Sequence, residues 1–176
     1  MKLIVSFLLI PWLLFSQGFD GRLMEIETAL FEKIIFLDYD IRKKLVQNRA
    51  EIYIVYKTKR QKRVAEKAAE ILDGKKFHDI PIKAHAVAFD MLQKRDTPTV
   101  YIAVLSSKDI QKLLQIAVKN HRLLFTYDPD NISHAMVSLQ IDAKITPIVN
   151  SDMLKQANIE LRPIIFKVAK IYRNAS

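Results

Sequence analysis

The sequence contains no cysteine and only three glycines among its 176 residues. Without cysteine the chain has no disulfide, no thiol nucleophile, no zinc–thiolate site and no redox switch. With so little glycine it has neither a phosphate-binding loop nor a dinucleotide fingerprint. The G-x-S-x-G and H-E-x-x-H signatures of common hydrolases are also missing. These absences predict a protein that is not an enzyme and needs no cofactor.

The sequence also lacks a pattern of metal ligands. Its four histidines are scattered, and none has the spacing of a metal pair: His78, His85, His121 and His134. His78 and His85 could still approach each other across a loop and a strand. The run 128–131 offers carboxylate oxygens but lacks the glycine and distal glutamate of a calcium loop, so it is interpreted as a turn. No metal site is predicted.

One long apolar run is present, at the N-terminus. Lys2 precedes an apolar block over 3–15, and Ser16 and Gly18 supply small residues after it. This order predicts a secretory signal peptide over 1–18, cut near Gly18, and a periplasmic product with no stable membrane span. The block is shorter than the roughly 20 apolar residues that cross a bilayer. An uncleaved anchor or an N-terminal core helix is the alternative.

The remaining chain, 19–176, predicts a single α/β domain in which strands and helices alternate. Such alternation indicates a three-layer domain with a mainly parallel sheet and helices on both faces. The last two strands are close together, so we expect a C-terminal antiparallel hairpin at the sheet edge. The strands are predicted over 51–57, 80–87, 99–105, 123–127, 135–141 and 144–149, and the helices over 25–37, 59–72, 88–93, 108–120, 151–156 and 162–172.

The last third of the chain carries a family resemblance. The segment 134–139 (HAMVSL) is followed by 145–150 (ITPIVN), then by Leu154, by 157–159 (ANI) and by 165–170 (IFKVAK). These motifs resemble those at the end of the YfiR-like family of exported bacterial proteins, and the upstream order of strands also fits.

This resemblance implies a periplasmic, non-catalytic regulator. The best-understood member of the family holds an inner-membrane diguanylate cyclase inactive by binding its periplasmic sensor region, and other members accompany membrane kinases. By resemblance, the expected partner is the periplasmic part of a membrane-bound signalling protein. A net charge of +9 would also suit nucleic acid, but export disfavours that partner.

Five of the seven residues in 57–63 are basic, at the end of a predicted strand and the start of a predicted helix. Helix N-termini attract anions, and ligands of parallel sheets bind beyond the carboxyl ends of strands. Lys57, Thr58, Lys59 and Arg60 are therefore candidates for binding an anionic ligand or an acidic partner surface. The alternative is a solvated run of charges, with Thr58 as a helix cap.

The next strand ends lead to Ser106, Ser107 and Tyr127. These residues complete the candidate ligand or partner site at the carboxyl edge of the sheet. A serine nucleophile with a lysine base is conceivable over 106–109. Helix capping by Ser107 explains the same residues without catalysis.

The first predicted helix is apolar on more than one face. Phe31, Ile35 and Phe36 extend beyond the stripe that one sheet would cover. This excess suits burial against a partner or a second subunit of a homodimer, although full burial inside the monomer is an equal alternative.

Three functions remain open from the sequence alone. The first is a regulator that docks on a membrane signalling protein, and the second is a periplasmic protein that binds a small anion or solute. The third, a hydrolase that uses Ser107 or unidentified carboxylates, is the minority hypothesis.

Overall fold

A computed structural model describes residues 15–174, with side chains described from Gly21 onward. The predicted signal peptide lies mostly outside these residues, and 15–18 form the first turn of helix α1. In the described part of the chain, no helix combines the length and apolar character needed to cross a bilayer. The signal peptide and its cut near Gly18 therefore stay predictions.

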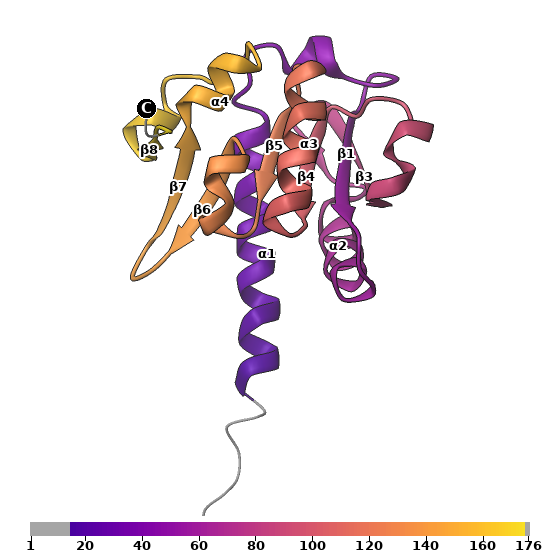
Figure 1. Cartoon of the computed structure of the whole chain (residues 1–176), viewed down its shortest axis with the longest axis vertical. Helices are drawn as coiled ribbons and strands as arrows, with labels where there is room; N and C mark the ends of the chain where they lie inside the picture. Colours follow the sequence, from indigo (N-terminus) through magenta and orange to yellow (C-terminus); the bar gives the residue numbers. More distant parts are fainter. Residues whose placement is uncertain (1–14, 175–176) are drawn as a thin grey trace, which may run out of the picture.

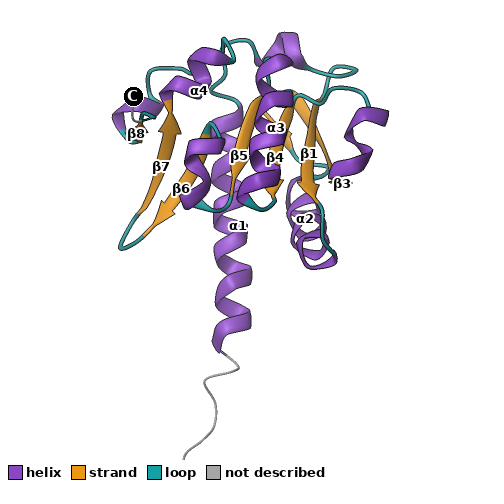
Figure 2. Ribbon diagram, in the orientation of Figure 1, coloured by secondary structure: helices purple, strands orange, loops and turns teal. Residues whose placement is uncertain are grey.

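The chain forms one eight-stranded sheet with helices on both faces, which confirms the predicted fold class (Figures 1 and 2). The strands are β1 (Ala50–Tyr56), β2 (Lys76–Phe77), β3 (Ile80–Ala88), β4 (Val100–Val104), β5 (Leu123–Thr126), β6 (Val137–Ile141), β7 (Ile145–Asn150) and β8 (Lys170–Tyr172). The α-helices are α1 (Phe15–Ile35), α2 (Lys59–Leu72), α3 (Ser107–Lys119) and α4 (Ser151–Gln156). Short 3-10 turns are η1 (Ile41–Lys44), η2 (Phe89–Lys94), η3 (Pro129–His134) and η4 (Ile165–Lys167).

The strand order in the sheet is β2-β3-β1-β4-β5-β6-β7-β8. The chain passes from β1 to β3 on one side of β1, and then to β4 on the other side of β1. Five neighbouring strands of this sheet run parallel to one another: β3, β1, β4, β5 and β6. Because crossovers are right-handed, this reversal places α2 and α3 on opposite faces of the sheet. The switch point of the topology lies between β1 and β4.

The predicted antiparallel hairpin is present as β6 and β7. The sequence predicted a helix over 162–172, and this prediction is wrong. That segment contains only the turn η4, and its last residues form β8, which pairs in parallel with β7 as the outermost strand. The backbone of β8 thus takes its hydrogen bonds from pairing with β7, which the local helical pattern does not reveal.

Helix α1 covers the face of the sheet opposite α3, alongside α2 (Figure 1). Phe31 contacts the rings of Phe125 and Tyr127, with ring centroids 4.9 and 5.1 Å away. Phe31 and Ile35 are fully buried in the core, and Phe36 is buried against the ring of Phe77. These three side chains are enclosed by their own chain, so they do not form the partner or dimer surface that we considered.

The parallel strands end on the side of the molecule from which α1 projects (Figure 1). We call this side the carboxyl edge of the sheet, and the opposite side the amino edge. The carboxyl edge carries the N-termini of α2 and α3, and the amino edge carries η1 and the turn between β2 and β3. The two edges are chemically different.

Candidate functional site

The carboxyl edge brings together six of the seven candidate binding residues. Lys57, Thr58, Lys59 and Arg60 follow β1, and Ser106 and Ser107 follow β4, the strand beside β1. The switch point between these strands is where parallel sheets usually present ligand-binding groups. The sequence therefore predicted correctly that these six residues share one end of the sheet, and their role in binding stays a prediction.

Lys57 and Ser106 are joined by a carboxylate that sequence reasoning missed. The Nζ atom of Lys57 lies 2.8 Å from Oδ1 of Asp109, and the hydroxyl of Ser106 donates to Oδ2 at 2.9 Å. The hydrogen bond from Lys57 lowers the pKa of Asp109, and the same contact raises the pKa of Lys57. Both groups are therefore held in their charged forms.

A second group of hydrogen bonds continues toward the end of β5. The hydroxyl of Ser107 donates to Oδ1 of Asn131 at 2.6 Å, and the amide of Asn131 donates to Asp128 at 2.9 Å. The predicted turn over 128–131 thus exists as the start of η3, and the carboxylate of Asp128 holds it by accepting from the backbone N–H of Asp130 at 3.0 Å. We refer to Lys57, Asp109, Ser106, Ser107, Asn131 and Asp128 as the carboxyl-edge network.

Thr58 is a helix cap, as the sequence predicted. Its hydroxyl accepts from the backbone N–H of Gln61 at 3.3 Å, and the side chain of Gln61 accepts from the backbone of Lys57 and Thr58. These reciprocal bonds form a capping box. Ser107 does not cap α3: the cap position belongs to Ser106, whose side chain is directed to Asp109 instead.

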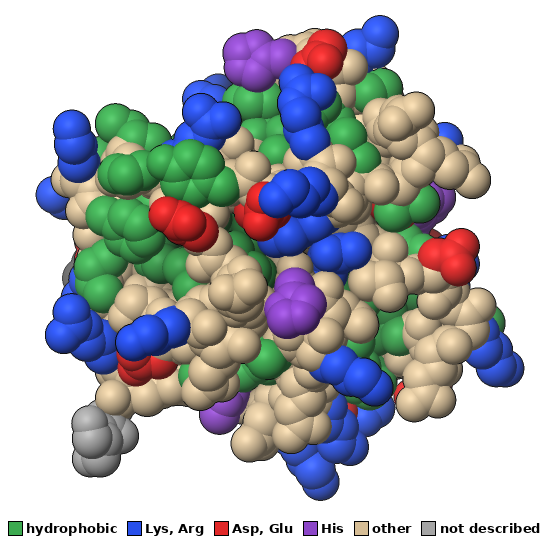
Figure 3. All heavy atoms as spheres, turned by 90° about the horizontal axis from the view of Figure 1, so that it is seen from above, with side chains coloured by type: hydrophobic (Ala, Val, Ile, Leu, Met, Phe, Trp, Pro, Cys, Tyr) green, Lys and Arg blue, Asp and Glu red, His purple; other side chains and the backbone are tan. Residues whose placement is uncertain are grey.

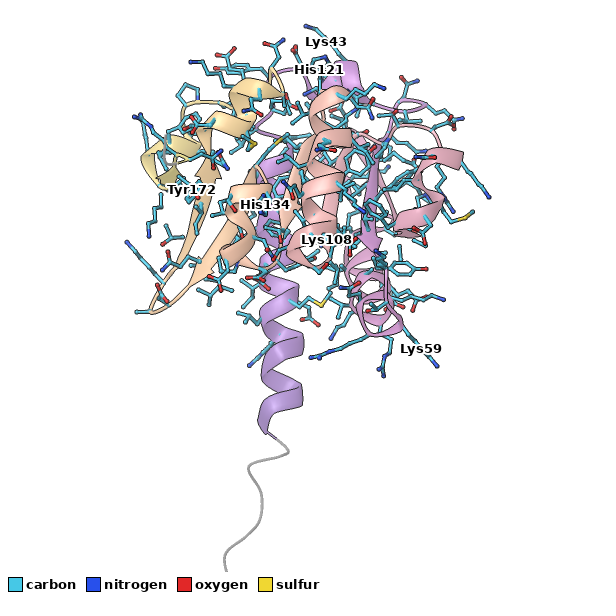
Figure 4. The ribbon with its side chains drawn as sticks, viewed as in Figure 1. Lys43, Lys59, Lys108, His121, His134 and Tyr172 are labelled. Atoms are coloured by element: carbon cyan, nitrogen blue, oxygen red, sulfur yellow. The ribbon has the colours of Figure 1, made fainter. Side chains whose placement is uncertain are left out.

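Lys59 and Arg60 stand outside the network. Both side chains are exposed, and neither forms an ion pair with another side chain of residues 21–174. The first turn of α2 contains no acidic residue, so its positive dipole end is not compensated. Figure 4 shows Lys59 extending from the end of α2 that faces the same side as the projecting α1.

Tyr127 is directed away from the network. Its hydroxyl lies 2.8 Å from the hydroxyl of Thr28 in α1, on the face of the sheet opposite α3. Burial raises the pKa of Tyr127 above its ordinary value. Tyr127 therefore packs against α1 and does not line the candidate site. The sequence could not reveal this contact, because α1 and Tyr127 are distant along the chain.

Two of the surface hollows are lined by residues within 21–174, and neither of these two includes a member of the carboxyl-edge network. A hollow of about 420 Å³ lies beside β8, between η3, the β6–β7 hairpin and Tyr172. A hollow of about 240 Å³ lies at the amino edge, beside Phe36 and Phe77. Among residues 21–174, whose side chains the structure describes, no cluster of histidine and acidic side chains could hold a metal ion.

The comparisons with known proteins give only distant likeness. No family model matches the chain, and no curated protein matches it. Among solved structures, an ABC domain from Streptococcus pneumonia in complex with L-Trp aligns at 8% identity and a TM-score of 0.49, over 84% of this chain and 61% of that one. A conserved domain protein from Vibrio cholerae aligns at 13% and 0.48, over 75% of this chain and 57% of that one.

This chain thus spans about three fifths of the length of those two structures. The likeness is too distant to say anything about a ligand or partner.

Proposed function

We propose that this chain is a non-catalytic regulator that docks on an acidic surface of a membrane signalling protein through its carboxyl edge. The observation that carries the proposal is the contrast within this edge. The side chains at the strand ends are already bonded to one another, whereas Lys59 and Arg60 are exposed and form no ion pair with a side chain of residues 21–174.

The carboxyl-edge network argues against catalysis. A nucleophilic serine needs a base to accept its proton, and a lysine base must be neutral. Here Lys57 is held protonated by Asp109, and the hydroxyls of Ser106 and Ser107 donate to oxygens that position them. The arrangement favours a rigid edge over a reactive one.

The charge of the edge favours an acidic partner. Lys59 and Arg60 occupy the N-terminal turn of α2, where the helix dipole adds to their positive potential. Exposed charges of one sign accelerate and orient association with a surface of opposite sign. The predicted export and the YfiR-like resemblance supply the expected class of partner, the extracytoplasmic region of a cyclase or kinase.

A second function, the binding of a small anion, is favoured by one observation. The N-termini of α2 and α3 meet at the switch point of the sheet, and such termini bind carboxylate and phosphate groups. The charged Lys57 lies between them, held by Asp109. We keep this function as the alternative because the charge of Lys57 is already paired with Asp109.

Charge reversal at the carboxyl edge tests the proposal. The parent and the double variant Lys59→Glu with Arg60→Glu are each cross-linked in the native host and purified. We expect the amount of partner isolated with the double variant to be at least tenfold lower than with the parent. The matched control reverses Lys119 and Lys155, two exposed lysines near the C-terminal ends of α3 and α4. The control variant should recover the partner as the parent does.

The tested variant should stay folded, because glutamates at the start of α2 interact favourably with the helix dipole. Equal recovery of the partner by both variants would contradict the proposal. Recovery of a bound small molecule with no cross-linked protein would favour the second function instead.

A further inference from the structure

The hollow of about 240 Å³ at the amino edge lies where three distant parts of the chain meet. The end of α1 contributes Phe36 and Leu37, and the β2–β3 hairpin contributes Phe77 and Ile80. The segment before η4 is fixed there by its backbone, since the N–H of Arg162 donates to the carbonyl of Leu37 at 2.8 Å. Figure 3 views this edge, where exposed apolar side chains lie among lysines and arginines.

The floor of the hollow is apolar and firmly packed. The rings of Phe36 and Phe77 are stacked, with centroids 4.2 Å apart and planes inclined by 6°. Phe36, Ile41 and Ile80 are each buried against the core. A floor of this kind has no groups to bind a hydrated inorganic ion, but it suits the apolar body of an organic ligand.

The rim of the hollow carries an excess of positive charge. The acidic residue of the rim is Asp79, and Arg42 pairs with it. The Nη2 and Nη1 atoms of Arg42 donate to Oδ1 and Oδ2 of Asp79 at 2.9 and 3.3 Å, and this contact lowers the pKa of Asp79. Arg162 is exposed, and no carboxylate pairs with it in the described part of the chain. Its guanidinium lies 5.7 Å from the centre of the Tyr39 ring.

His78 lies on the same rim, in the two-residue turn that joins β2 to β3. Its φ angle is +52°, as tight hairpin turns of this length require at a central position. The turn places His78 and Asp79 at the mouth of the hollow.

We propose that this hollow binds a small organic carboxylate with an aromatic or aliphatic body. The body would rest on Phe36 and Phe77, and the carboxylate would pair with the planar guanidinium of Arg162, which presents two parallel donors. Since the hollow lies at the edge opposite Lys59 and Arg60, this site is independent of the proposed docking surface. The failure of either proposal would leave the other intact.

Phenylacetate is a suitable probe because it joins one ring to one carboxylate. The chain is studied without its predicted signal peptide. We expect two-dimensional NMR to show saturable shifts of the Phe36, Phe77 and His78 signals when phenylacetate is added. A ligand of this size should bind with a dissociation constant on the order of millimolar. The neutral phenylacetamide should bind at least tenfold more weakly.

Variants separate the site from unspecific binding. Arg162→Met keeps an unbranched apolar stem and removes the guanidinium, so we expect at least a tenfold loss of affinity for phenylacetate. Arg63→Met, an exposed arginine on α2, is the matched control and should bind as the parent does. A second variant, Leu37→Trp, should fill the hollow and abolish the shifts, with its thermal unfolding measured to confirm folding.

Three results would overturn this inference. One is the absence of saturable shifts at the amino edge, and another is equal binding of the neutral amide. The third is a set of shifts confined to the carboxyl edge, which would assign the anion to the helix N-termini of α2 and α3.

Discussion

Glu27 is a carboxyl group that folding buries beneath the sheet. It lies on α1 beside Thr28, with 8% of its surface exposed. Burial raises the pKa of Glu27 from 4.5 to about 7. The next residue, Thr28, forms a hydrogen bond with Tyr127, so Glu27 lies beside the contact between α1 and the end of β5.

The raised pKa predicts that the protein loses stability as pH rises. Between about pH 4.5 and 7 the folded state keeps a proton that the unfolded chain releases, so the free energy of unfolding falls across this range. A shift of this size corresponds to about 3 kcal/mol at most. We expect Glu27→Gln to flatten this dependence, so that the variant is more stable than the parent at pH 8, as measured by urea unfolding.

The control for this experiment is Glu25→Gln, an exposed glutamate on the same helix. It should retain the pH dependence of the parent. The same decline between pH 5 and 8 in the Glu27→Gln variant would show that another group is responsible.

At the scale of single residues, the sequence predicted what local patterns determine. Thr58 precedes Gln61 by three residues, which is the spacing of a capping box, and the structure confirms this cap. The burial of Glu27 and the role of Asp109 depend on contacts between distant segments. The one signal in the sequence for the hydrogen bond between Ser106 and Asp109 is their spacing, since Asp109 follows Ser106 by three residues.

Among the elements, α2 is the one whose stability can be tested most simply. Its capping box satisfies backbone N–H groups that would otherwise lack partners. We expect Thr58→Ala to lower the free energy of unfolding by about 1 kcal/mol. Thr58→Ser keeps the accepting hydroxyl and should retain most of that stability, and equal losses in the two variants would argue against a capping role.

The elements also show where pattern reasoning fails. The bounds of α2 and α4 match the prediction, because each has a cap and a clear apolar face. The segment 162–172 has apolar residues at helical spacing, but Ile164, Phe166 and Val168 are exposed. Its last three residues pair with β7, and this pairing is determined by the sheet edge rather than by local sequence.

For the whole molecule, the sheet separates two surfaces of different character. The carboxyl edge is polar and internally bonded, with Lys59 and Arg60 exposed beyond it. The amino edge carries the apolar hollow beneath Arg162. The alternation of strands and helices was enough to predict which residues lie at the carboxyl edge. The hollow could not be predicted from the sequence, because α1, the β2–β3 turn and Arg162 form it together and are far apart along the chain.

We propose that this domain meets an acidic protein partner at its carboxyl edge. The most direct test uses two chains that differ only in the position of a photoreactive residue, which is placed at 59 in one and at 119 in the other. Each chain is cross-linked in the native host, and mass spectrometry identifies the products. We predict that position 59 yields a cross-link to an acid-rich extracytoplasmic segment of a membrane protein. This product should be lost when Arg60→Glu is added, and position 119 should yield none of it. Equal cross-linking from both positions, or a product from position 119 alone, would contradict the claim.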